Sequence, residues 1–114
     1  MKPQSLKILI IVPAFNESGN ITRTIADIRK QELQLDILVI DDGSKDSTLF
    51  EATKAGVNAV SLPFNLGIGG AVQTGFKYAL KYDYDIAIQM DGDGQHNASF
   101  ISKLIDPILN DQAD

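Results

Sequence analysis

Two aspartates separated by a single glycine are the residues of this sequence best suited to chemistry. Asp91 and Asp93 lie in the segment QMDGDGQH, which follows a short aliphatic run. Carboxylates on alternate residues of an extended turn can face one ion, and hard oxygen ligands suit Mg²⁺ or Mn²⁺. Gly92 and Gly94 permit the close backbone approach that a bound phosphate needs. The segment therefore predicts a divalent-metal site, although a simple polar Asp-Gly turn has the same composition.

The two residues that follow this motif are further candidates for the site. Gln95 can supply a third metal ligand through its amide oxygen. His96 can ligate a metal or point at a phosphate, but a lone histidine beside a helix start is also common as a turn or capping residue. Gln95 is therefore the better candidate for a direct role.

A second acidic pair, Asp41 and Asp42, ends the run DILVIDD and precedes Gly43. A carboxylate at a strand end can accept hydrogen bonds from a nucleobase or a ribose. The alternative is that Asp41 or Ser44 caps the next helix. Both interpretations place the pair at the end of a buried strand.

The glycine-rich segment NLGIGGAVQTG opens a helix whose N–H groups could assist a phosphate. It matches the dinucleotide-binding fingerprint poorly, because Val72 stands where a third glycine is needed and the segment does not follow the first strand. Close helix packing explains Gly69, Gly70 and Gly75 equally well. The segment alone does not define a site.

The hydrophobic pattern predicts a scaffold that brings these strand ends together. Four aliphatic runs, at 6–13, 36–42, 57–63 and 85–91, are each followed by a helical pattern. The first three helices are expected near 20–31, 46–55 and 68–81. Strands that alternate with helices imply an α/β fold with a Rossmann-like, doubly wound, mostly parallel sheet. Ligands of such sheets bind beyond the carboxyl ends of the strands, where the candidate residues lie.

Three details of the helices are also expected. Ser18 or Asn20 should cap the first helix, and Pro107 should kink the fourth. One face of the third helix should pack on the sheet. Its residues are Ile68, Ala71, Val72, Gly75, Phe76, Ala79 and Leu80.

Length and composition limit the function classes. The chain has 114 residues, enough for one domain with a modest core. Its net charge of −5 argues against a broad nucleic-acid footprint. A bound polyanion would therefore need a metal ion, a helix N-terminus, or both. The absence of cysteine fits a reducing compartment, and we find no signal peptide and no apolar stretch near spanning length, so a cytoplasmic location is expected.

Four ordered segments resemble the family 2 inverting glycosyltransferases, particularly those similar to polyprenol-phosphate mannosyl- and glucosyltransferases. The segments are IIVPAFNES, similar to the opening nucleotide loop, VIDDGSKDST, NLGIGGAVQTGFKYA, and MDGDGQH, similar to the DxD metal motif. The resemblance implies a GT-A-type fold that binds a UDP- or GDP-sugar through Mg²⁺ or Mn²⁺. It also implies transfer to a lipid phosphate or a glycan in cell-envelope synthesis, at the inner face of the membrane, and no nucleic-acid partner is expected.

The resemblance also implies roles for individual residues. Pro13, Ala14, Asn16 and Glu17 would surround the base and ribose, with Asp42 on the base. Asp91 would hold ribose or metal beside Gly92, and Asp93 and Gln95 would hold the metal. Asn97-Ala98 stands where relatives often carry a proline, a departure that affects helix entry alone.

The acidic general base and the acceptor site of relatives lie beyond the DxD motif, past residue 114. The remaining acids, such as Asp27, Glu32, Glu51, Asp83 and Asp106, are expected on helices or at strand starts. Residues 1–114 are therefore expected to be the nucleotide-sugar-binding part of a GT-A domain, without a catalytic base and with an exposed sheet edge that invites self-association.

Two other classes share part of the pattern. A phospho-accepting receiver domain also contains a run like ILVIDD, but it places its acidic pair after the first strand and needs a late strand that ends in lysine. A dinucleotide-binding domain is disfavoured by the imperfect glycine motif. Both remain alternatives at this level.

Overall fold

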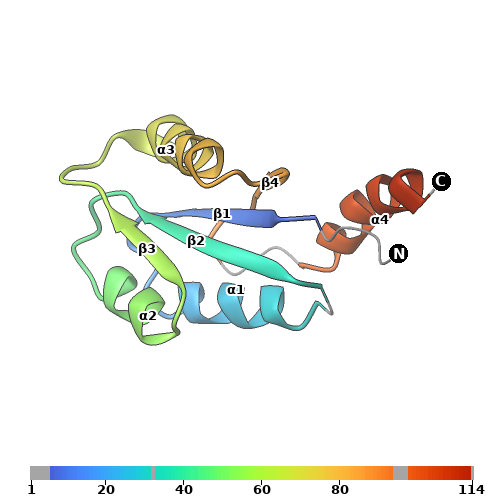
Figure 1. Ribbon diagram of the computed structural model, residues 1–114. Helices are drawn as coiled ribbons and strands as arrows, with labels where there is room; N and C mark the ends of the chain where they lie inside the picture. The colour runs from blue at the N-terminus through green and yellow to red at the C-terminus, as the bar shows by residue number, and fades with distance from the viewer. Residues whose placement is uncertain (1–5, 32, 94–97, 114) are drawn as a thin grey trace.

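The computed structural model describes residues 6–31, 33–93 and 98–113, which form one sheet with helices on both faces (Figure 1). The elements in chain order are β1 (Ile8–Ala14), α1 (Asn20–Arg29), β2 (Leu35–Asp41), α2 (Thr48–Lys54), β3 (Asn58–Ser61), α3 (Gly67–Lys81), β4 (Ile86–Gln89) and α4 (Phe100–Ala113). Each predicted strand and helix is present, with ends that differ from the prediction by a few residues.

The four strands are all parallel and lie in the order β3-β2-β1-β4. Helices α1 and α2 cover one face of the sheet, and α3 covers the other (Figure 1). The start of α4 contributes Ile101 and Ile105 to the same core as α1. The predicted doubly wound α/β architecture is confirmed.

Strand β1 is central because both of its faces are apolar. Its seven residues are all buried. Ile8, Ile10 and Val12 face the core under α1, whereas Leu9 and Ile11 face the core under α3. Burying a side chain of this size contributes about 1.5–3 kcal/mol, so the run fixes the strand in the middle of the sheet.

The predicted packing face of α3 is only partly right. Ala71, Gly75 and Ala79 are buried against the sheet, and a Cβ on Gly75 would come within 2.4 Å of the Ile11 side chain. Small residues four apart thus let the helix approach β1 closely, and the buried line is narrow. The larger residues of the predicted face, Ile68, Phe76 and Leu80, are exposed.

The predicted cap of α1 is wrong. The N-cap residue is Gly19, in a left-handed conformation, and it makes no side-chain cap hydrogen bond. Neither Ser18 nor Asn20 fills this role, because acceptors from a different part of the chain reach the helix start, as described below. Pro107 lies inside α4 as expected, and the kink there stays a prediction.

Strand β4 pairs with β1 along one of its edges and ends the described sheet. The predicted self-association through an exposed sheet edge stays untested. In the part of the chain that the structure describes, α1 to α4 are too short or too polar to cross a membrane.

Candidate functional site

The carboxyl ends of β1, β2 and β4 meet around a cavity of about 210 Å³. Its lining combines residues from four separate segments of the sequence. They are Pro13, Ala14, Phe15, Glu17, Asp42, Ile68, Asp91, Gly92 and Asp93. The cavity therefore brings together most of the residues that the sequence singled out for nucleotide and metal binding.

Asp91 and Asp93 both line this cavity, just past the end of β4. The side-chain amide of Gln89 (Nε2) donates to the Asp91 carboxylate over 3.3 Å. Gly92, between them, is buried, and a Cβ there would lie 3.2 Å from both Val12 and Ile21. The glycine therefore lets the motif lie directly on the end of β1.

The predicted metal ligands are described only in part. Gln95 and His96 lie outside the described residues, so their predicted roles stay predictions. Among the described residues, no three histidine, cysteine or acidic side chains are close enough together to hold a metal ion. Two carboxylates with a short spacing still fit the oxygen-rich partial ligand set with which proteins bind Mg²⁺ or Mn²⁺.

Asp42 lies at the cavity wall and also holds the start of α3. One carboxylate oxygen accepts from the Leu66 amide over 2.7 Å and the other from the Gly67 amide over 2.9 Å. The side chain is 4% exposed. Because of these two hydrogen bonds, Asp42 has a structural role whether or not it binds a ligand. The predicted contact with a base would use the remaining lone pairs of the same two oxygens.

Replacing Asp42 with alanine should lower the free energy of unfolding by about 1–3 kcal/mol, because two amides at the start of α3 lose their buried acceptor. Urea denaturation measures this change. Asp36→Ala is the matched control, since Asp36 lies at the other end of β2 and accepts from the Tyr84 hydroxyl at an exposed position. An Asp42→Ala variant as stable as the parent would contradict the assigned contact.

Asp41 does not cap a helix. Its carboxylate accepts from the Ser44 amide over 3.1 Å and so closes the turn after β2. The N-cap residue of α2 is Ser47, which makes no side-chain cap bond. The alternative that Asp41 or Ser44 caps the next helix is therefore wrong.

Four consecutive backbone amides of the loop after β1 donate to side chains of a single segment, residues 44–51. The pairs are Asn16 to Ser44 Oγ (2.8 Å), Glu17 to Thr48 Oγ1 (2.9 Å), Ser18 to Asp46 Oδ2 (3.1 Å) and Gly19 to Glu51 Oε1 (2.8 Å). In return, the Lys45 amide donates to Asn16 Oδ1 over 2.9 Å. We call these interactions the loop clasp.

The loop clasp settles where Asn16 points. Its side chain is engaged with the backbone of Lys45, and it is not among the residues that line the cavity. Pro13, Ala14 and Glu17 do line the cavity. Of the four residues predicted around a base and ribose, the structure thus brings three to the cavity.

Two acids of the loop clasp have lowered pKa values. The Thr48 hydroxyl, followed by the Thr48 and Ser18 amides, lowers the pKa of the Asp46 carboxyl. The Ser18 hydroxyl and the Gly19 amide lower the pKa of Glu51. Both groups therefore remain ionised acceptors at neutral pH and lose this role only as the pH falls below the ordinary range of carboxyl groups.

Sequence reasoning missed two residues of the cavity, Phe15 and Ile68. They are apolar but 43% and 60% exposed, respectively. Ile68 was instead assigned to the packing face of the third helix, and the available signal for Phe15 was a large apolar residue just after the end of β1. Together they give the acidic cavity an apolar wall.

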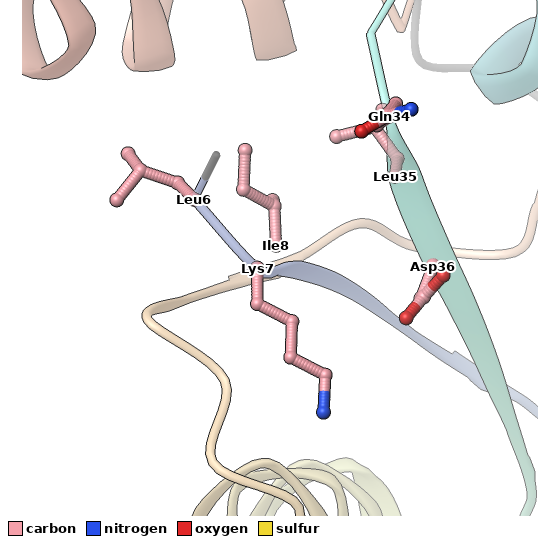
Figure 2. Close-up of a pocket in the computed structure, with 6 residues that line it drawn as sticks. All are labelled: Leu6, Lys7, Ile8, Gln34, Leu35 and Asp36. Carbon is pink, nitrogen blue, oxygen red and sulfur yellow. The ribbon is translucent and has the colours of Figure 1, made fainter. Parts of the chain in front are cut away.

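A larger cavity, about 470 Å³, lies at the opposite end of the strands (Figure 2). Lys7 of the chain before β1 and Asp36 of β2 point to the same side there. Their polar groups already have partners, because the Lys7 ammonium lies 4.4 Å from the centre of the Tyr84 ring and the Tyr84 hydroxyl donates to Asp36. This cavity lacks the convergent acids found at the carboxyl ends.

The parallel sheet, the strand-end cavity and its acid-glycine-acid motif are those of a GT-A-type α/β fold. The sequence model described as glycosyl transferase family 2 matches residues 9–114. The chain belongs to this family, and the receiver and dinucleotide-binding alternatives no longer apply.

Named relatives and solved structures agree with this assignment. The chain is 36% identical to the UDP-N-acetylglucosamine–dolichyl-phosphate N-acetylglucosaminyltransferase of Methanococcus voltae, over 91% of this chain and 48% of the relative. It is 32% identical to the polyprenol monophosphomannose synthase of Mycolicibacterium smegmatis, over 90% of this chain and 41% of the relative.

The fold also matches that of the glucosyl-3-phosphoglycerate synthase of Mycobacterium tuberculosis, crystallised with Mn²⁺, UDP and glucosyl-3-phosphoglycerate. The TM-score is 0.71 at 27% identity, over 91% of this chain and 40% of the other. The chain thus spans less than half the length of these relatives.

Proposed function

We propose that this chain is the donor-binding part of a family 2 glycosyltransferase and that it holds a nucleoside diphosphate sugar through Mg²⁺ or Mn²⁺. One observation carries the proposal. The described lining of the strand-end cavity contains four carboxylates, from Glu17, Asp42, Asp91 and Asp93, and no basic side chain. An anionic diphosphate can bind beside so many acids only if a cation lies between them.

The helix starts near the cavity support the same conclusion. The amides of Ser18 and Gly19, before α1, already donate to the carboxylates of Asp46 and Glu51. The amides at the start of α3 donate to Asp42. These amides already donate to carboxylates and are not available to a phosphate. Of the two ways to bind a phosphate that the sequence left open, a metal ion and a helix N-terminus, we therefore favour the metal ion.

In this proposal each group has a separate task. Asp91 and Asp93 hold the metal, with Gln95 as a proposed third ligand. A metal held there would supply Lewis-acid assistance to the departure of the diphosphate. Pro13, Ala14 and Glu17 shape the place for the base and ribose, and the apolar wall covers one side of it.

The substrates follow from the relatives by analogy. One relative is named for UDP-N-acetylglucosamine and dolichyl phosphate, and another for polyprenol monophosphomannose. We therefore propose a UDP- or GDP-sugar as donor and a polyprenol phosphate or a glycan as acceptor, with the reaction at the inner face of the membrane. The general base and the acceptor site are proposed to lie beyond these residues.

A thermal-shift panel tests the proposed function. UDP-, GDP- and dTDP-sugars are each added with Mn²⁺ or with EDTA. We expect at least one donor to raise the melting temperature in Mn²⁺, because a ligand that binds only the folded state stabilises it by about 2.7 kcal/mol at a hundred times its Kd. NADH serves as the control nucleotide. If no nucleoside diphosphate sugar raises the melting temperature of the chain, the proposal is contradicted.

A further inference from the structure

Thr48 is the fully buried residue of the loop clasp, and it is hydrogen-bonded to Glu17, which lines the strand-end cavity. Thr48, the first residue of α2, is 0% exposed. Its hydroxyl accepts the Glu17 amide over 2.9 Å and donates to the Asp46 carboxylate. Glu17 lines the strand-end cavity, whereas Thr48 does not. Thr48 therefore reaches the site only through the backbone of Glu17.

The loop that carries Glu17 needs such outside support. Asn16 has a φ of 52° and Gly19 a φ of 85°, so two of its residues adopt left-handed conformations within four positions. This conformation is unfavourable for a non-glycine residue such as Asn16. Few bonds within the loop offset that cost, since its four successive amides all donate to the 44–51 segment.

We propose that Thr48 and Asp46 are positioning residues that set the Glu17 backbone, and with it the nucleotide loop, in the shape that receives the donor. The inference rests on the proposed function, since it concerns the same cavity. It assigns to the 44–51 segment a task beyond joining β2 to α2. That task is to preorganise the loop after β1, so that binding does not have to order it.

The chemistry of the pair explains why these residue types are needed. A threonine hydroxyl both donates and accepts. The Asp46 carboxylate takes the hydroxyl proton and also accepts the Thr48 amide over 3.0 Å. The hydroxyl is thereby oriented with a lone pair toward the Glu17 amide. Valine has the same shape but no acceptor, and it would leave that amide without its partner.

The test compares Thr48→Val with Thr48→Ser in the 114-residue chain. Calorimetry measures the Kd of UDP and of GDP with Mn²⁺, at a temperature where circular dichroism shows each variant to be folded. We expect Thr48→Val to raise the Kd of whichever nucleotide binds by about tenfold, the loss of roughly one hydrogen bond. Thr48→Ser keeps the hydroxyl and should stay within about twofold, although loss of its buried methyl group lowers the melting temperature.

The two variants separate positioning from stability. If both lower the melting temperature and neither changes the Kd, Thr48 only supports the fold and the inference is overturned. If Thr48→Val does not fold, Asp46→Asn at the exposed Asp46 decides, with an expected rise in Kd of about threefold. Asp27→Asn, on the exposed side of α1, is its control. An unchanged Kd in Asp46→Asn also overturns the inference, whereas a parent chain that binds neither nucleotide contradicts the proposed function instead.

Discussion

Removal of divalent metal should lower the affinity of this chain for a nucleoside diphosphate by roughly a hundredfold or more, about 2.7 kcal/mol. Without a cation, the diphosphate would face the four carboxylates of the cavity, and like charges at such short range repel strongly. Calorimetry with UDP and GDP, in Mn²⁺ and in EDTA, gives the ratio directly. Equal affinity in EDTA would show that the charges are balanced in another way.

The variant Asp93→Asn should remove most of this metal effect while the chain stays folded. An amide oxygen is a weaker ligand for a hard cation than a carboxylate, and Asp93 lies past the end of β4, outside the core. Asp83→Asn removes the same charge in the turn between α3 and β4 and is the control. If both variants keep the full metal effect, the metal does not depend on Asp93.

Gly43→Ala should lower the free energy of unfolding by about 2–5 kcal/mol. Gly43 has a φ of 78°, and a Cβ there would lie 2.8 Å from the Asn65 nitrogen and 2.9 Å from the Phe64 carbonyl carbon. Part of the cost is the left-handed conformation, and part is the collision with backbone atoms that cannot move independently. Urea denaturation measures the total.

Gly56→Ala is the matched control for Gly43→Ala. Gly56 has a φ of 85°, but the nearest atom to its added Cβ is 3.8 Å away, on the Arg29 side chain. It should therefore cost only the conformational part, about 1–2 kcal/mol. Equal losses in the two variants would mean that the contact between Gly43 and the 64–65 backbone does not constrain the fold.

The strands and the strand-end acids could be predicted because their signals are local. An unbroken aliphatic run such as residues 8–12 specifies a strand buried on both faces wherever it lies. Once the strands are parallel, their carboxyl ends share one edge, and this geometry alone brings Asp42 near Asp91.

The partners of the helix starts could not be predicted in this way. Ser18 looked like a cap for α1, yet the acceptor for the Gly19 amide is Glu51, which lies 32 residues away. The structural contact of Asp42 could not be predicted for the same reason. The amides that donate to it, at the start of α3, lie 24 and 25 residues away in the sequence. A single sequence shows which residues can accept a hydrogen bond but not which donor the fold brings to them.

The predicted packing face of α3 was only partly right for a different reason. A helical pattern shows which residues share a face, but it does not say how wide the contact with the sheet is. Here the small side chains of Ala71, Gly75 and Ala79 set a close approach, and the larger residues beside them extend past the contact. The width depends on the facing side chain of Ile11, which the helix sequence does not contain.

The acidic lining of the strand-end cavity also makes metal and nucleotide mutually dependent ligands. Thermodynamic linkage requires that a nucleotide increase the affinity for the metal by the same factor by which the metal increases the affinity for the nucleotide. A hundredfold effect in one direction is therefore a hundredfold effect in the other. A cavity lined by Glu17, Asp42, Asp91 and Asp93 should then be occupied by both ligands or by neither over a wide range of free metal concentration, so that donor supply controls how much metal the protein retains.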